Sequence, residues 1–296
     1  MTLDTSPAAA RTDDALDACL ERAVAHMRSI QHRDGYWWAE LESNATMAAE
    51  HVMLEHVLGI VDATRMRKLQ RYLLGLQQLD GSWPVYYGGP GDVSVSAEAY
   101  FALKLTGMPT DAPQMTRARD FVRAKGGIGA ARIFTKIWMA MFGQVDWAAL
   151  PAMPPEAILL PDRFPLNIYE FASWARATMV AILVVWAKRP VVTGTPGAEE
   201  LFVDPADRRR IEFKRDAKPL SWRNAFLAID RLLKLHERSP WKPLRSRALR
   251  ACEEWIVDHQ ERDGSWGGIQ PPWVYSLIAL KTLGYTHDHP VMAKGI

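Results

Sequence analysis

The stretch QHRDGYW at residues 31–37 returns with the same spacing as QQLDGSW at 77–83 and QERDGSW at 260–266. The first two copies begin 46 residues apart, and the third begins 183 residues after the second, one residue short of four such periods. A signature that recurs at a fixed period of this length predicts an array of helix pairs, in which the middle copies have lost the signature.

The residue types of the motif suit the end of a helix. Glycine adopts the left-handed conformation that terminates a helix without a Cβ penalty, and aspartate favours the same turn through hydrogen bonds to nearby backbone. The glutamine could bind the open N-terminus of the next repeat's helix, while the tryptophan covers the joint with an apolar ring. We therefore interpret the motif as a structural staple between repeats, carried by Gln31, Gly35, Trp37, Gln77, Gly81, Trp83, Gln260, Gly264 and Trp266.

Hydrophobic periodicity predicts an all-α fold. No long segment alternates with a period of two, so β-sheet can be at most minor, whereas helical spacing of apolar residues recurs along the whole chain. The expected helices are Ala15–Ile30, Ala45–Leu58, Arg65–Gln77, Val95–Leu105, Gln114–Arg123, Arg132–Phe142, Phe171–Lys188, Ser221–Glu237, Leu244–Gln260 and Pro272–Leu283. Residues 1–14 are expected to form a flexible arm, and the Pro-, Gly- and charge-rich residues 190–220 a long surface connection or a poorly ordered excursion.

Composition limits the classes of function. The 296 residues are 48% hydrophobic and 24% charged, which is typical of a globular protein. A net charge of +2 does not indicate nucleic-acid binding, although a pI near 8.5 would suit an anionic membrane surface. The amphipathic segment Ser221–Glu237 either turns its apolar side to the core or lies in a membrane interface, and its sequence leaves both open.

Two carboxylates stand out. Glu50 and Glu98 fall on the apolar stripes of their helices, where an unpaired carboxylate would be costly. Either each lies near a helix start and reaches solvent, or both belong to a buried network with a basic partner such as Arg132 or Arg176. No metal site is predicted, because His51 and Glu55 share a helical face without an evident third ligand.

Three longer blocks accompany the repeats: GYWWAELESNATMAAE (35–50), PLNIYEFASWARATMV (165–180) and DGSWGGIQPPWVYSLIALK (263–281). Together they resemble the bacterial squalene–hopene cyclases, from about Asp14 to Ile296. The resemblance implies an α/α barrel, and a cavity between two such barrels in which squalene is cyclised to hopene, or to hopanol when water captures the last cation. It further implies an isomerase (intramolecular transferase) with hydro-lyase chemistry in the hopanol branch, and no metal or cofactor.

The resemblance also implies site residues and surroundings. The expected lining of the substrate cavity is Trp174, Phe134, Phe171, Ile269, Gln270 and Pro271, and the expected polar network is Glu50, Glu98 and Arg132. For each aromatic residue, ordinary core packing is the alternative. Squalene and a membrane surface are the expected partners, without nucleic acid, and a homodimer is a further option. The expected location is the cytoplasmic face of the inner membrane, with peripheral attachment.

One feature of the family is missing. Its proton donor is the middle aspartate of an Asp-x-Asp-Asp motif, and no such motif occurs in these 296 residues. We therefore expect the N-terminal half of a cyclase, with residues 15–285 as its barrel region, 286–296 as the truncated start of a second domain, and a C-terminal half as partner. Two other interpretations stay open: a non-catalytic helical-repeat protein that binds a polyprenoid, and a cyclase of another polyprene.

Overall fold

The computed structural model describes residues 7–38, 42–164, 167–211 and 215–296, with side chains from residue 13 onward. All regular secondary structure in these ranges is helical apart from one isolated bridge between Pro84 and Gly91, as the sequence predicts. The chain divides into two compact units, residues 1–42 and 43–296. This division differs from the predicted domains, because the boundary follows Glu42 and residues 286–296 pack within the larger unit.

The smaller unit contains helix α1 (Pro7–Ser29) and the first copy of the motif. The helix begins eight residues before the predicted Ala15, so the expected flexible arm is helical from Pro7, and its first six residues lie outside the described ranges. One face of α1 carries the exposed apolar residues Leu16, Leu20, Val24 and Met27, and this stripe continues into Ile30 after the helix ends.

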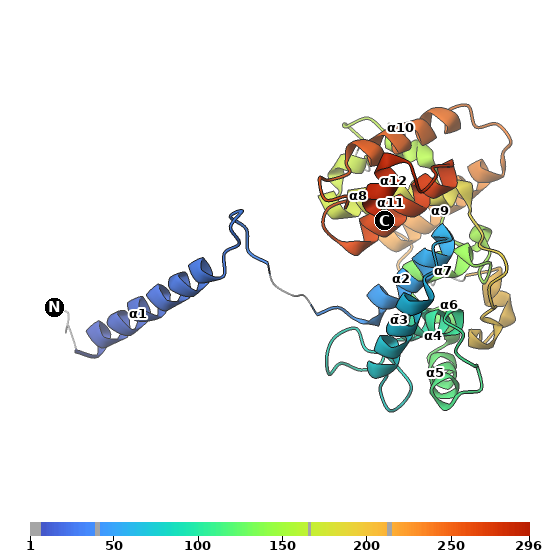
Figure 1. Cartoon of the computed structure of the whole chain (residues 1–296). Helices are drawn as coiled ribbons and strands as arrows, with labels where there is room; N and C mark the ends of the chain where they lie inside the picture. The colour runs from blue at the N-terminus through green and yellow to red at the C-terminus, as the bar shows by residue number, and fades with distance from the viewer. Residues whose placement is uncertain (1–6, 39–41, 165–166, 212–214) are drawn as a thin grey trace. The chain divides into compact units, whose positions relative to one another are not determined.

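The larger unit has an inner and an outer layer of helices (Figure 1). The inner helices are buried over most of their surface: α2 (Ala45–Leu58), α4 (Val93–Leu105), α8 (Ser173–Lys188) and α11 (Gln270–Leu283). The outer helices bury only one apolar stripe each: α3 (Ala63–Gly75), α5 (Pro113–Ala124) and α10 (Arg245–Asp258). Helix α8 packs on α11, α11 on α2, and α2 on α4, while α3, α5 and α10 cover this row from outside.

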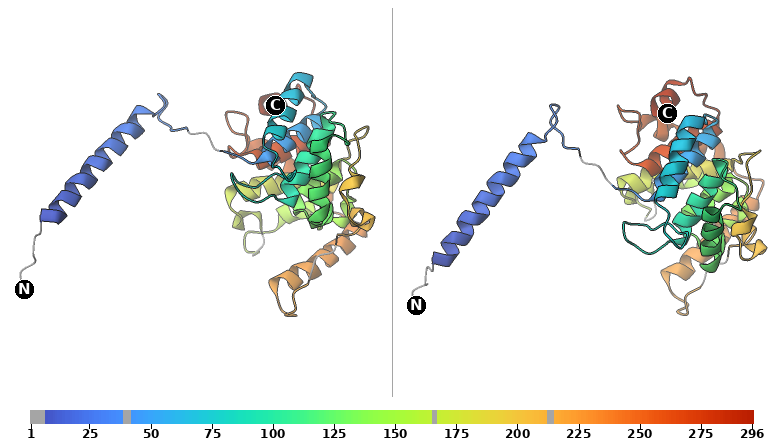
Figure 2. Two further views of the ribbon diagram at one scale, coloured as in Figure 1. Left: turned by 90° about the horizontal axis from the view of Figure 1, so that it is seen from below. Right: turned by 60° about the horizontal axis from the view of Figure 1, so that its bottom comes forward.

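Shorter elements complete this unit. They are α6 (Gly127–Ala130), α7 (Ile133–Met141), α12 (Pro290–Gly295) and five 3₁₀ turns: Trp147–Ala149, Pro155–Leu159, Ile168–Glu170, Glu199–Leu201 and Pro205–Arg208. The helices from α2 to α7, blue to green, gather side by side in Figure 2.

Local chemistry explains where the inner helices start and stop. The Asn44 side chain accepts a hydrogen bond from the Thr46 N–H at the start of α2, and Asp92 caps α4 through the N–H groups of Ser94 and Val95. Helix α2 ends at Gly59, whose φ of 75° places it in the left-handed region. These caps fix the first turns of α2 and α4, from which Glu50 and Glu98 extend.

The three motif copies form the same turn. The glutamine Nε2 donates to the glycine carbonyl at 2.8, 3.0 and 3.0 Å, and the tryptophan Nε1 donates to the carbonyl ten residues earlier at 2.6, 2.8 and 2.7 Å. Gly35, Gly81 and Gly264 have φ values of 90°, 89° and 92°. The turn is therefore a local property of the seven residues.

Two copies additionally join the second helix downstream, past α4 and α11 respectively. Gln77 donates a second hydrogen bond to the Gln114 carbonyl in the first turn of α5, at 3.0 Å, and Gln260 donates to the Val291 carbonyl in the first turn of α12, at 2.8 Å. The glutamine thus binds a carbonyl of that helix by its N–H group, rather than the free N–H groups expected from the sequence. Gln31 makes no such second contact within residues 7–38.

Residues 190–220 are a packed connection and not a poorly ordered excursion over their described part. Leu201 and Phe202 are buried, and the Glu200 carboxylate accepts hydrogen bonds from the Tyr100 hydroxyl at 2.7 Å and Lys104 Nζ at 2.6 Å, both on α4. Arg123 of α5 donates to the Phe202 carbonyl at 2.5 Å. Polar contacts with α4 and α5 therefore fix this segment against these helices, although its composition is typical of a loop.

Helix α9 (Trp222–Arg238) does not turn its apolar side to the core. None of its residues is buried, and the side chains of Trp222, Leu232 and Leu235 are 82%, 68% and 65% exposed. Its polar side faces the body instead, where Asp230 accepts the Ala152 N–H at 2.7 Å. Leu233 alone among the apolar residues of α9 packs against the core, so the core-facing interpretation does not fit most of this helix.

Candidate functional site

An apolar cavity of about 580 Å³ opens beside α2, α7, α8 and the start of α11. Hydrocarbon and aromatic side chains make up most of its wall, with Glu50 and Arg132 at its polar end. The cavity brings together residues from Asn44 to Tyr275, 231 positions apart in the chain, among them five of the six predicted lining residues: Phe134, Phe171, Trp174, Ile269 and Pro271.

The sixth, Gln270, lies behind this wall rather than in it. Its Nε2 donates to the Met47 carbonyl at 2.9 Å, which joins the start of α11 to the first turn of α2. Met47 and Ile269 both line the cavity, so Gln270 supports the lining from the other side.

Trp174 is held at the cavity by a hydrogen bond and a glycine. Its indole Nε1 donates to the Gly267 carbonyl at 2.8 Å, across from the turn that precedes α11. A Cβ at Gly267 would lie 2.8 Å from Trp174 Cδ1, and Gly267 has a φ of 71°, so the position requires glycine on two grounds. The indole edge is fixed, while more than half of the side chain stays exposed.

The buried Glu98 and Thr135 form a network behind Glu50 with Arg132, whose side chain is 40% exposed. Arg132 Nη2 lies 3.2 and 3.3 Å from the two carboxylate oxygens of Glu98, and the Thr135 hydroxyl donates to the same carboxylate. Burial nevertheless raises the pKa of Glu98, since Arg132 and Thr135 only partly offset the loss of solvation. The buried-network interpretation of the two glutamates fits this geometry, and the solvent-reaching one does not.

Glu50 is 5% exposed, and the Trp138 indole N–H lies close to its carboxylate without forming a well-aligned hydrogen bond. Burial raises its pKa to about 8, with a further contribution from the negative charge of Glu98, while Arg132 acts in the opposite direction. Burial, together with two carboxyl groups facing one guanidinium, favours retention of a proton by this pair near neutral pH.

Two residues at this end were not singled out from the sequence. Trp138 and Tyr275 are fully buried, their rings lie 5.9 Å apart, and neither the indole N–H nor the hydroxyl has a hydrogen-bond partner among the described residues. Burial and the charges of Glu50 and Glu98 raise the pKa of Tyr275 well above its ordinary value. Buried donors of this kind usually bind an internal water, and these two lie beside the glutamate pair.

Arg176, the alternative basic partner, lies elsewhere. Its guanidinium is centred 4.9 Å from the Tyr169 ring, and its Nη2 donates to the Phe171 carbonyl at 3.1 Å. Arg132 therefore balances the glutamates, whereas Arg176 supports the backbone beside Phe171.

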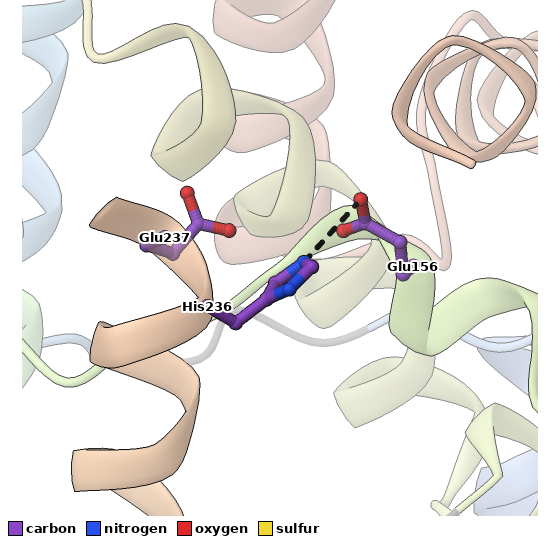
Figure 3. A group of neighbouring side chains, drawn as sticks. All are labelled: Glu156, His236 and Glu237. Atoms are coloured by element: carbon purple, nitrogen blue, oxygen red, sulfur yellow. Dashed lines mark ion pairs between the residues drawn. The ribbon is translucent and has the colours of Figure 1, made fainter. Parts of the chain in front are cut away.

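A second cluster of ionisable groups joins α9 to the body. Glu156, His236 and Glu237 point toward one another in Figure 3, with His236 Nε2 at 4.0 Å from Glu156. Arg245 is paired with both carboxylates, and Lys242 Nζ lies 3.7 Å from Glu237. These residue types could ligate a metal, but the neighbouring cations already neutralise the carboxylates, so the cluster is best described as a network of salt bridges.

Comparison with known proteins gives the family. The squalene-hopene cyclase N-terminal domain family matches residues 20–296. The chain belongs to this family. Its all-α fold, with inner and outer helices, is accordingly of the α/α-toroid type found in terpene cyclases.

Three curated relatives match nearly the whole of this chain. The squalene–hopene cyclase of Alicyclobacillus acidocaldarius is 44% identical over 292 residues, which cover 98% of this chain and 44% of the relative. The squalene–hopene cyclase of Zymomonas mobilis is 35% identical over 99% of the chain and 45% of the relative. The dammaradiene synthase of Dryopteris crassirhizoma is 37% identical over 95% of the chain and 41% of the relative. The chain thus spans less than half the length of these relatives.

Proposed function

We propose that the chain forms one wall of the substrate cavity of a triterpene cyclase, whose complete form converts squalene to hopene or hopanol. The observation that carries this proposal is the meeting of Phe134, Phe171 and Trp174 at one apolar cavity with a polar end. Aromatic faces stabilise a migrating carbocation without trapping it, and an apolar enclosure excludes the water that would end the reaction early. The complete protein would then act as an isomerase.

The glutamate pair suits the end of such a reaction. A carboxylate facing the cavity would attract and trap a cation, whereas the proton that Glu50 and Glu98 retain near neutral pH weakens that attraction. The unpaired donors of Trp138 and Tyr275 would hold a water there, which could accept the last proton or capture the last cation. The initial proton would come from an Asp-x-Asp-Asp motif in the remainder of the complete protein.

The direct test uses squalene with this chain alone and with a separately expressed C-terminal half of a complete cyclase. We expect no cyclic product from the chain alone, and hopene or hopanol when the two halves are combined. Cyclic product from these 296 residues alone would contradict the claim that the acid lies elsewhere. If squalene binds but no product forms, either with the chain alone or with the two halves combined, the polyprenoid-binding interpretation is favoured. If product forms only from another polyprene, a cyclase of that polyprene is favoured.

We further propose peripheral attachment to the cytoplasmic face of the inner membrane through α9. The exposed apolar side chains of this helix continue into Leu220 and Trp241, and basic residues such as Arg223 and Arg231 flank them. Such a helix binds in the interfacial plane of a bilayer. Within the described residues, no helix combines the length and the hydrophobicity needed to cross a membrane.

Vesicle binding tests this attachment. We expect the double variant Leu232→Glu, Leu235→Glu to lose most of its co-sedimentation with anionic vesicles, because two apolar contacts become charged. Folding should be unaffected, since both side chains are exposed. Leu79→Glu, at an exposed leucine outside α9, serves as the control for the added charge. Equal sedimentation of the double variant and the wild type would rule out α9 as the membrane contact. Light scattering of the protein without vesicles reports whether the chain forms a homodimer.

A further inference from the structure

The orientation of Trp174 at the apolar cavity depends on one backbone carbonyl. The indole Nε1 donates to the Gly267 carbonyl at 2.8 Å, and this is the side chain's only hydrogen bond among the described residues. Because Trp174 is 56% exposed, packing on one side leaves the ring room to tilt. The position of the Gly267 carbonyl therefore determines how the indole face is presented to the cavity.

This carbonyl belongs to the most flexible kind of backbone. It lies in the peptide unit between Gly267 and Gly268, whose φ values are 71° and 64°. Glycine has more accessible backbone conformations than any other residue, so two in succession allow the peptide between them to rotate unless another group restrains it. A fixed orientation of Trp174 thus requires a restraint on Gly267.

The Glu261 side chain supplies that restraint. Its Oε1 accepts a hydrogen bond from the Gly267 N–H at 3.1 Å, and its Oε2 accepts one from the Ser265 hydroxyl at 3.4 Å. The backbone of Glu261 is itself held, because its N–H donates to the Ser265 carbonyl at 2.9 Å and its carbonyl accepts from Lys294 Nζ at 3.2 Å. The carboxylate therefore connects the motif turn to the glycine that holds Trp174.

Comparison with the second motif copy shows that this contact is not part of the common turn. There Gln78 takes the place of Glu261, and Pro84 takes the place of Gly267. Proline has no N–H to donate and its φ is fixed by its ring, so no restraint is needed. The Gln78 amide donates instead to the Gly89 carbonyl at 2.9 Å. Between these two copies, the carboxylate occurs where the residue after the motif is a glycine that must be fixed.

We propose that Glu261 is a positioning residue that orients the Trp174 indole through Gly267. The third motif copy then has two roles, since Gln260 ties the turn to α12 and Glu261 fixes the face of a cavity aromatic. An aromatic ring stabilises a cation over its face and not at its edge, so a tilted indole would lose this effect. The consequence for the reaction rests on the proposed cyclase function, whereas the orientation itself does not.

The indole N–H of Trp174 gives a direct test by nuclear magnetic resonance of the chain labelled with ¹⁵N-tryptophan. The Trp174→Phe variant assigns its resonance. We expect Glu261→Ala to shift this resonance and to speed its exchange with water by about threefold or more, because the hydrogen bond to Gly267 loosens. Glu261→Gln keeps an oxygen acceptor and should restore both values. Gln78→Ala, at the same position of the second copy, should leave both unchanged.

Glu261 is exposed, so the fold should survive the substitution, and unchanged resonances of the other indoles report that it does. An unaltered Trp174 resonance and exchange rate in Glu261→Ala would overturn the proposal. Equal effects of Glu261→Ala and Glu261→Gln would overturn it as well, because they would show that the charge matters and the hydrogen bond does not.

The kinetic test combines the chain with a separately expressed C-terminal half and squalene. We expect Glu261→Ala to lower kcat by about threefold or more without changing KM, because the face of one aromatic ring no longer meets the cation. An unchanged kcat beside a shifted Trp174 resonance would contradict the role in the reaction. Absence of product with the wild-type chain would count against the proposed function alone, since the resonance tests the positioning independently.

Discussion

Glu50 should make the stability of the larger unit depend on pH. Its pKa is about 8 in the folded protein against an ordinary value of 4.5, mainly because of burial. A carboxyl group whose pKa is raised on folding contributes its full stabilisation below about pH 4.5 and loses it as the pH rises through about 8. We therefore expect the free energy of unfolding to fall between pH 5 and pH 9, and Glu50→Gln to flatten this fall.

Chemical denaturation at pH 5, 7 and 9 measures the effect. Glu254→Gln is the matched control, because Glu254 is an exposed glutamate on α10. An equally steep fall in Glu50→Gln and in the wild type would show that other groups cause the pH dependence.

The sequence pattern identifies the two glutamates as unusual residues but does not identify their aromatic neighbours. Glu50 and Glu98 stand out because a carboxylate on an apolar stripe breaks the pattern. Trp138 and Tyr275 do not, because a large aromatic residue on a buried helix fits the pattern, and only atomic positions reveal that their polar atoms are unpaired. Arg132 could be predicted as one of two partners, but choosing it over Arg176 required the packing of α7 against α2 and α4.

At the level of elements, α9 shows what periodicity cannot decide. A helix with one apolar and one polar side has the same pattern whether the apolar side faces inward or outward. Here the direction is set by acidic groups on the polar side, chiefly Asp230 and Glu237, which find partners on the body. Asp230 meets the Ala152 N–H, 78 residues earlier in the chain, and Glu237 meets Arg245 at the start of α10, and these positions cannot be derived from α9 itself.

We expect Glu237→Gln to loosen α9. The Glu237 side chain is 7% exposed and balances Arg245, with Lys242 and Arg189 nearby at 3.7 and 3.8 Å. Removing its charge leaves Arg245 with Glu156 alone and takes a carboxylate partner from Lys242 and Arg189, at a cost of about 1–3 kcal/mol for a partly buried charged partner. Hydrogen exchange of the α9 amides should accelerate accordingly, whereas Arg231→Gln, which changes an exposed charge on the same helix, should leave it unchanged. Unaltered exchange in Glu237→Gln would mean that other contacts hold the helix.

For the whole molecule, the repeat period predicted helix pairs and the places where helices end, because the motif forms its turn from local hydrogen bonds alone. It did not predict how residues 190–220 pack. That segment has no periodicity, and its position depends on Glu200 meeting Tyr100 and Lys104 of α4, contacts about 100 residues apart in the chain.

The three motif copies lead to a prediction about assembly. Gln77 and Gln260 each bind the first turn of a following helix, while Gln31 binds only its own turn within residues 7–38. If a helix of the complete protein supplies the second acceptor for Gln31, Gln31→Ala should weaken association with a separately expressed C-terminal half and leave the unfolding of residues 43–296 unchanged. Gln77→Ala should instead lower the free energy of that unfolding by about 1–2 kcal/mol, because it loses its hydrogen bonds within the unit. Association measured by titration calorimetry and unfolding measured by denaturant separate the two effects, and identical behaviour of both variants would argue that the first copy is complete without a partner.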